Sequence, residues 1–107
     1  MAKKINQEIL QLVKSFKQDL QKHNLNINQI LIFGSQVKGT THPDSDIDIA
    51  IISPDLTEDY GDNYIKLTTL NPRMDIRIEP HGFTPEDFED KWNPLAREIK
   101  KHGILIE

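Results

Sequence analysis

The chain contains no cysteine, and this absence excludes several classes of protein. Disulfide-stapled scaffolds, thiolate zinc sites and enzymes with a cysteine nucleophile all require that residue. Long hydrophobic runs are also absent, since Ile30–Phe33 is as long as any and a membrane span needs roughly 20 apolar residues. The polar N-terminus does not resemble a signal peptide. We therefore predict a soluble protein, located in the cytoplasm and without a membrane partner.

Positive charge is scarce relative to negative charge. Thirteen Lys and Arg face seventeen Asp and Glu, which gives a formal net charge of -4. This balance opposes the attraction to phosphate backbones on which general nucleic-acid binding depends, so no such binding is expected. The length of 107 residues fits one globular domain, and we predict a single domain over residues 1–107.

Hydrophobic periodicity predicts a mixture of helices and strands. Ile5, Ile9, Leu12, Phe16 and Leu20 recur at helical spacing, which indicates an amphipathic N-terminal helix. Strands are expected at Ile30–Phe33, Asp46–Ser53, Met74–Glu79 and Ile104–Ile106, and helices at Tyr60–Leu70, from Thr84 to Trp92 and from Leu95 to Gly103, with a helical turn at Ser35–Thr40. This order predicts an α/β (α+β) fold, a small mixed β-sheet packed with helices.

Two short features bear the chemistry of the first half of the chain. Gly34-Ser35 follows the first predicted strand, where a glycine lets the backbone approach a ligand and the next amides can face a phosphate. Asp46 and Asp48 alternate with Ile47, so on a strand they leave the same face about 6.6 Å apart and can share one divalent cation. The competing interpretations are a plain turn for Gly34 and a solvated edge strand for the two aspartates.

The surroundings of the two aspartates favour a functional interpretation. Residues 39–65 carry seven acids and no Lys or Arg. Asp75 adds a third carboxylate on the third predicted strand, and three such groups can hold two Mg²⁺ ions and a nucleoside triphosphate. An ion pair of Asp75 with Arg73 or Arg77 is the structural alternative.

These residues resemble a known family. Gly34-Ser35, ten intervening residues and Asp46-Ile47-Asp48 form the Gly-Ser-x10-Asp-x-Asp motif of the DNA polymerase beta-like nucleotidyltransferases. The segments 33–39 and 45–49 resemble the minimal nucleotidyltransferases (MNT), which are small stand-alone members. Gln36 and Lys38 stand where that family often has arginine, so a bidentate phosphate contact is lost at each.

The resemblance implies both an activity and its residues. A nucleoside monophosphate would pass from ATP or another triphosphate to an acceptor hydroxyl. The implied cofactor is Mg²⁺, bound as two ions, with Mn²⁺ as the alternative metal. The residues implied in nucleotide binding are Gly34, Ser35, Lys38 and Ser45. The metal-binding and catalytic residues implied are Asp46, Asp48 and Asp75, with Asp75 as the base.

Length and resemblance together suggest the acceptor. Larger relatives carry an added substrate domain, for which 107 residues leave no room, so a partner chain is expected to supply the acceptor. The resemblance implies an antitoxin that adenylylates a tyrosine of a HEPN-type ribonuclease toxin. The alternatives are a non-catalytic module that acts by occlusion, or a catalytic subunit paired with an RNA- or drug-binding chain. A homo- or hetero-oligomer is compatible with each.

The remaining polar and aromatic residues suggest no second site. His23, His81 and His102 lie near predicted element ends, where solvated or capping roles are expected, and His42 is placed to touch a phosphate. The aromatic residues expected to belong to the core or its cover are Tyr60, Tyr64, Phe83, Phe88 and Trp92. The alternative is that one of them stacks on an adenine base.

Overall fold

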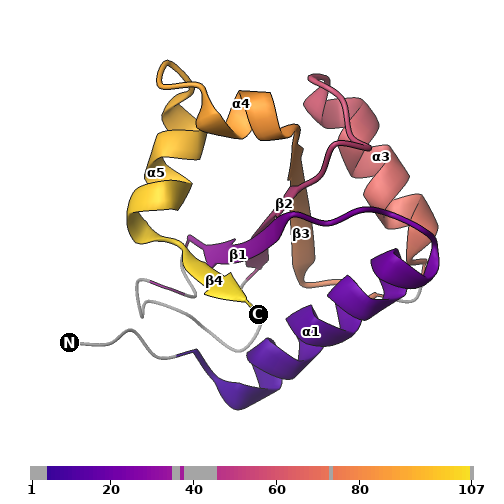
Figure 1. Cartoon of the computed structure of the whole chain (residues 1–107). Coiled ribbons are helices and arrows are strands. Elements are labelled where there is room, and N and C mark those ends of the chain that lie inside the picture. Colours follow the sequence, from indigo (N-terminus) through magenta and orange to yellow (C-terminus); the bar gives the residue numbers. More distant parts are fainter. Residues whose placement is uncertain (1–4, 35–36, 38–45, 73, 107) are drawn as a thin grey trace.

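The computed structural model describes residues 5–34, 37, 46–72 and 74–106. Helices and strands are interspersed along the chain (Figure 1). The elements are α1 (Gln7–Lys22), β1 (Gln29–Phe33), β2 (Ile47–Ile52), α3 (Tyr60–Leu70), β3 (Ile78–Phe83), α4 (Pro85–Glu89), α5 (Pro94–His102) and β4 (Ile104–Ile106). None of the helices in these described ranges has both the length and the apolar character that a membrane span requires.

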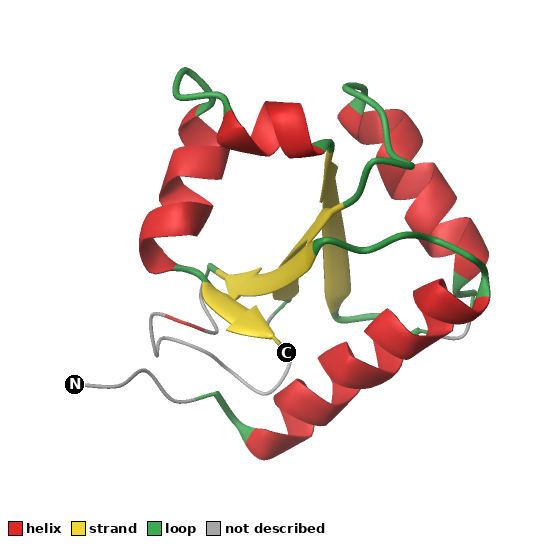
Figure 2. Ribbon diagram, viewed as in Figure 1, coloured by secondary structure: helices red, strands yellow, loops and turns green. Residues whose placement is uncertain are grey.

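The sheet is mixed and has the strand order β3-β2-β1-β4 (Figure 2). β1 pairs antiparallel with both β2 and β4. β2 and β3 are parallel, and α3 lies in the crossover between them, as parallel neighbours require. The predicted fold class, a small mixed sheet packed with helices, is confirmed. β2 is an interior strand, so the alternative that placed Asp46 and Asp48 on an edge strand is wrong.

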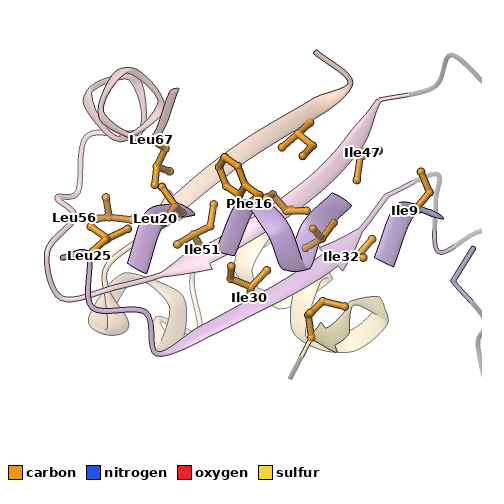
Figure 3. Close-up of a cluster of buried hydrophobic side chains, with 14 residues drawn as sticks. Ile9, Phe16, Leu20, Leu25, Ile30, Ile32, Ile47, Ile51, Leu56 and Leu67 are labelled. Carbon is orange, nitrogen blue, oxygen red and sulfur yellow. The ribbon is translucent and has the colours of Figure 1, made fainter. Parts of the chain in front are cut away.

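One face of the sheet packs against α1 and α3. Three residues of the predicted apolar stripe, Ile9, Phe16 and Leu20, are buried in α1 and meet the isoleucines of β1 and β2 (Figure 3). Leu12 is only partly buried, and Ile5 precedes the helix. Asn6 caps this helix, since its side chain accepts a hydrogen bond from Glu8 N at 2.7 Å. α3 contributes Leu67 to the same cluster. This face carries the larger part of the core and has no polar side chain of the candidate site.

The opposite face packs against α4 and α5. Phe88 of α4 and Ala96 and Ile99 of α5 cover a second cluster that contains Phe33 and Ala50. Both helices begin as their sequences indicate, because Thr84 and Asn93 cap them and a proline follows each cap. Helices therefore cover both faces of the sheet.

The third strand differs from the prediction. The alternation of Met74–Glu79 suggested a strand that stops at Pro80, whereas β3 begins at Ile78 and continues through Pro80. Pro80 is tolerated because β3 is an edge strand, from which the sheet does not need every N–H group. The preceding residues form a turn in which Ile78 N donates to the Asp75 carbonyl at 3.0 Å. Asp75 consequently lies before β3 and not on it.

Candidate functional site

Three side chains with metal-binding atoms gather on the face of the sheet that α4 and α5 cover. Asp48 of β2 pairs in register with Glu79 of β3, and His81 lies two residues further along β3. Because strand side chains alternate, these three point away from Ile47 and Ile49, which face α1. One donor atom from each of the three lies within 4.8 Å of the others.

The His81 ring is held in place from two sides. Its Nε2 atom lies 3.3 Å from Asp48 Oδ1. The ring of Phe33 meets it edge-on, with centroids 5.1 Å apart. The side chains of Asp48 and His81 are 25% and 28% exposed, so a small ligand can reach them while much of each is shielded.

Gly34 brings the chain into contact with this cluster. It follows Phe33, the register partner of Asp48, and adopts the left-handed conformation with φ of 76°. A Cβ atom at this position would collide with Asp48 Oδ2. Val37 N donates to the Gly34 carbonyl at 3.1 Å and closes a turn. Glycine is therefore required here both by the backbone conformation and by the proximity of Asp48.

The other residues of the predicted motif are placed less completely. Ser35, Lys38 and Ser45 lie outside the described residues, as do His42 and most of the predicted helical turn. Asp46 is described, exposed, and immediately precedes β2. It is not one of the three residues whose donor atoms converge within 4.8 Å. The structure thus brings Gly34 and Asp48 together, with Asp46 two residues away along the chain.

Asp75 lies on the other side of the sheet, next to α1. Its carboxylate accepts hydrogen bonds from Arg77 Nε and Nη2 at 3.0 Å and from Arg77 N at 2.9 Å. Arg77 also lies 3.7 Å from Glu8 of α1. A cavity of about 100 Å³ is lined by Asp75 together with Leu12 and Phe16 of α1. The pairing of Asp75 with Arg77, one of the two sequence interpretations, is confirmed.

This pairing determines the charge state of both groups. The side-chain hydrogen bond from Arg77, followed by the bond from its backbone N–H, lowers the pKa of Asp75 below the ordinary aspartate value. The same bond to Asp75 raises the pKa of Arg77 further. Asp75 is thus an ionised and already neutralised carboxylate, whereas Asp48 has another carboxylate, Glu79, as its register partner.

Sequence reasoning missed Glu79 and His81. Glu79 was the last residue of the third predicted strand and had no predicted role, and His81 was expected to be solvated or capping. His81 instead lies within β3 beside Asp48, so that expectation is wrong. The signal that was available is the alternation of Glu79, Pro80 and His81, which continues the strand pattern past the proline.

Two open pockets lie next to the cluster of Asp48, Glu79 and His81, and both are bordered by α5. A cavity of about 200 Å³ is lined by Phe33, Gly34, Val37 and Leu95, together with Glu98 and His102. A second, of about 130 Å³, is lined by Tyr60, Tyr64, Glu79, His81, Phe83 and Leu95. Leu95 lies in both walls. The Asp48 cluster therefore has one pocket on the Gly34 side and another on the Glu79 side.

The aromatic residues of the second pocket are not core residues, apart from Phe83. Phe83 and Phe88 are buried as predicted, whereas Tyr60, Tyr64 and Trp92 are 44%, 47% and 78% exposed. The Tyr60 hydroxyl accepts a hydrogen bond from Asn93 Nδ2 at 2.7 Å, which ties α3 to the start of α5. Burial raises the pKa of Tyr60, and the hydrogen bond with Asp87 adds to this effect.

The donor set fits a divalent cation. Two carboxylates and one imidazole converge, and the missing Cβ of Gly34 lets Asp48 Oδ2 lie against the backbone. Two carboxylates on neighbouring strands repel each other, and a cation between them removes that repulsion. The arrangement can hold a metal ion next to Gly34.

Comparisons with known proteins identify the fold and the family of the chain. The fold is similar to that of a crystal structure from Sulfolobus solfataricus reported as a candidate nucleotidyltransferase, with a TM-score of 0.67 and 19% identity over 92% of this chain and 78% of that chain. No curated protein sequence matches the chain. Residues 11–106 match the nucleotidyltransferase domain family. Because that match spans nearly all of the sequence, the chain belongs to the nucleotidyltransferase domain family.

Proposed function

We propose that the chain transfers a nucleoside monophosphate from a nucleoside triphosphate to an acceptor hydroxyl. The acceptor oxygen forms a bond to the α-phosphorus, the bond from that phosphorus to the bridging oxygen breaks, and pyrophosphate leaves. The observation that carries this proposal is the contact of Gly34 with Asp48, whose register partner is Glu79. It joins a phosphate-compatible turn to paired carboxylates.

The residues of the Gly34 side are assigned to the nucleotide. Gly34 and Ser35 would hold the terminal phosphates through their backbone amides, with Lys38 and Ser45 as further contacts. Asp46 and Asp48 would hold a divalent cation, Mg²⁺ or Mn²⁺. Such an ion neutralises the charge of the triphosphate and of the leaving pyrophosphate.

The third carboxylate has two candidates, and we favour Glu79 over Asp75. Glu79 is the register partner of Asp48, and it lines the pocket beside it. Asp75 already holds Arg77 through both of its oxygens on the α1 side. Glu79 is thus the carboxylate placed to accept or orient the proton of an entering hydroxyl.

The acceptor is proposed to be a side chain of a partner protein. The pocket of about 130 Å³ beside Glu79 is open to solvent, so a side chain presented by another protein can approach it. The resemblance to minimal nucleotidyltransferases supports a HEPN-type ribonuclease toxin as that partner and adenylylation of its tyrosine as the outcome. The chain would then act as an antitoxin.

One experiment tests the transfer and the choice of carboxylate together. The chain is incubated with a HEPN-type partner, ATP and Mg²⁺ or Mn²⁺, and intact-protein mass spectrometry follows the partner. Adenylylation by the parent protein and by Asp75→Asn, but not by Glu79→Gln, is the expected result. The reverse pattern would assign the third carboxylate to Asp75. Neutralisation of the toxin without any mass change and without ATP would overturn the transfer in favour of occlusion.

A further inference from the structure

The metal cluster contains a nitrogen donor that an all-oxygen Mg²⁺ site does not have. Asp48 and Glu79 offer carboxylate oxygens, and His81 offers Nε2. Mg²⁺ prefers oxygen ligands and retains its waters, whereas imidazole is a ligand of first-row transition metals. The identity of the third donor therefore bears on which ion the chain binds.

The geometry of the three donors suits direct coordination by the imidazole. Neighbouring ligands of an octahedral ion with bonds of about 2.1 Å lie about 3 Å apart. His81 Nε2 and Asp48 Oδ1 are 3.3 Å apart, close to that separation before any ion draws them together. The same ring nitrogen that now faces Asp48 is thus the one that an ion would bind.

The supports of the cluster are independent of the ion. The parallel register of β2 and β3 sets Asp48 opposite Glu79, and Ala50, the register partner of His81, has a side chain too short to cover the ring. Phe33 packs edge-on against that ring. The absence of a Cβ on Gly34 lets the Asp48 carboxylate lie directly against the backbone, which limits its movement. Little reorganisation is therefore needed on binding.

We propose that His81 is a direct metal ligand, and that with Asp48 and Glu79 it makes the site select a first-row divalent transition metal such as Mn²⁺ over Mg²⁺. This inference rests on the proposed function only for the role of the bound ion, which would be to assist nucleotidyl transfer. Its test is a binding measurement on the protein without nucleotide. Selectivity arises because the imidazole adds affinity for Mn²⁺ but little for Mg²⁺.

The test uses Mn²⁺ itself as the probe. Pulsed electron paramagnetic resonance of the Mn²⁺-loaded chain should show a nitrogen hyperfine coupling, which His81→Gln should remove. The same variant should weaken Mn²⁺ binding about tenfold and leave Mg²⁺ binding nearly unchanged, as measured by calorimetry. His23→Gln is the matched control, because His23 is an exposed residue at the end of α1.

The outcomes separate this inference from the proposed function. Absence of nitrogen coupling in the parent protein would overturn the assignment, whatever the folding of the variant. Equal loss of Mn²⁺ and Mg²⁺ affinity in His81→Gln would overturn the selectivity. Adenylyl transfer in Mg²⁺ without nitrogen coupling to Mn²⁺ would leave the function intact and refute the ligand. Nitrogen coupling to Mn²⁺ without any adenylyl transfer would support His81 as a ligand and contradict the proposed function.

Discussion

Gly34 shows how one residue connects the two halves of the motif. Its backbone adopts a positive φ, which side chains with a Cβ rarely accept, and its Cα faces a carboxylate oxygen of Asp48. Either constraint alone would favour glycine. Together they mean that a substitution changes the backbone and the metal cluster at the same time.

Gly34→Ala should therefore lower both stability and metal affinity. The left-handed conformation costs alanine about 1–2 kcal/mol, and the collision must displace the Asp48 carboxylate. Urea unfolding and Mn²⁺ titration measure the two effects. Gly61→Ala, at an exposed position in the first turn of α3, is the control and should bind Mn²⁺ like the parent protein. Parent-like Mn²⁺ affinity in Gly34→Ala would show that Asp48 does not bind the ion.

The ion pair of Asp75 leads to a pH-dependent prediction. The folded pKa of Asp75 lies below its unfolded value, so the stabilisation is complete above the ordinary aspartate pKa and is lost as pH falls through the folded pKa. Asp75→Asn should lower the melting temperature by no more than a few degrees at neutral pH, because the pair is partly exposed. The difference from the parent should disappear in acid. Arg77→Gln should abolish the same pH dependence, and a constant difference at every pH would contradict this account.

At the scale of elements, α3 is fastened to β3 by a buried amide. Asn63 is 1% exposed, and its Nδ2 donates to the carbonyls of Thr57 at 2.7 Å and Gly82 at 3.1 Å. Its Oδ1 accepts from Thr57 N at 2.9 Å. A Cβ on Gly82 would lie 2.8 Å from Asn63 Cβ, so the helix and the strand are in close contact. This contact positions Tyr60 and Tyr64 along the pocket.

Asn63→Ala should destabilise the fold by about 2 kcal/mol, because it removes the partner of the buried Gly82 carbonyl and of the partly buried backbone groups of Thr57. Chemical denaturation measures the change. Asn28→Ala is a suitable control, since Asn28 is exposed and precedes β1. Equal stability of the two variants would mean that water replaces the amide without cost.

At the scale of the whole molecule, the site depends on strands that are distant in sequence. β1, β2 and β3 each supply one part, namely Gly34 after β1, Asp48 within β2, and Glu79 and His81 within β3. An unfolded chain holds these groups apart and has no comparable site. Metal binding and folding are consequently linked.

A divalent ion should therefore raise the melting temperature of the chain. At a concentration of roughly 100 times its Kd, an ion that binds only the folded state adds about 2.7 kcal/mol to the free energy of unfolding. Differential scanning calorimetry with Mn²⁺ and then with EDTA measures the gain and its reversal. The double variant Asp48→Asn, Glu79→Gln should show no shift, and a shift equal to that of the parent would place the ion elsewhere.

Local patterns in the sequence determined most of the elements. The apolar period of α1, the cap at Thr84 and the isoleucine-rich strands are short-range signals, and the helices and strands that they mark lie close to their predicted positions. The helix that begins after Thr84 is shorter than predicted, since it ends at Glu89 and not at Trp92. The Gly34 and Asp48 motif could also be read directly, because its spacing is fixed along the chain. Each of these signals depends on residues close together in sequence.

Only the tertiary structure decided which residues join Asp48. The register of β3 against β2 follows from the crossover through α3, and no local pattern specifies it. Pro80 suggested the end of a strand, yet at the sheet edge it is accommodated, and this places Glu79 and His81 beside Asp48. Asp75 looked equally suitable in sequence, but it precedes β3 and pairs with Arg77 near α1. The spacing of residues along the sequence can identify candidate metal-binding carboxylates. Which of these carboxylates lie close together depends on the register between strands that are distant in sequence.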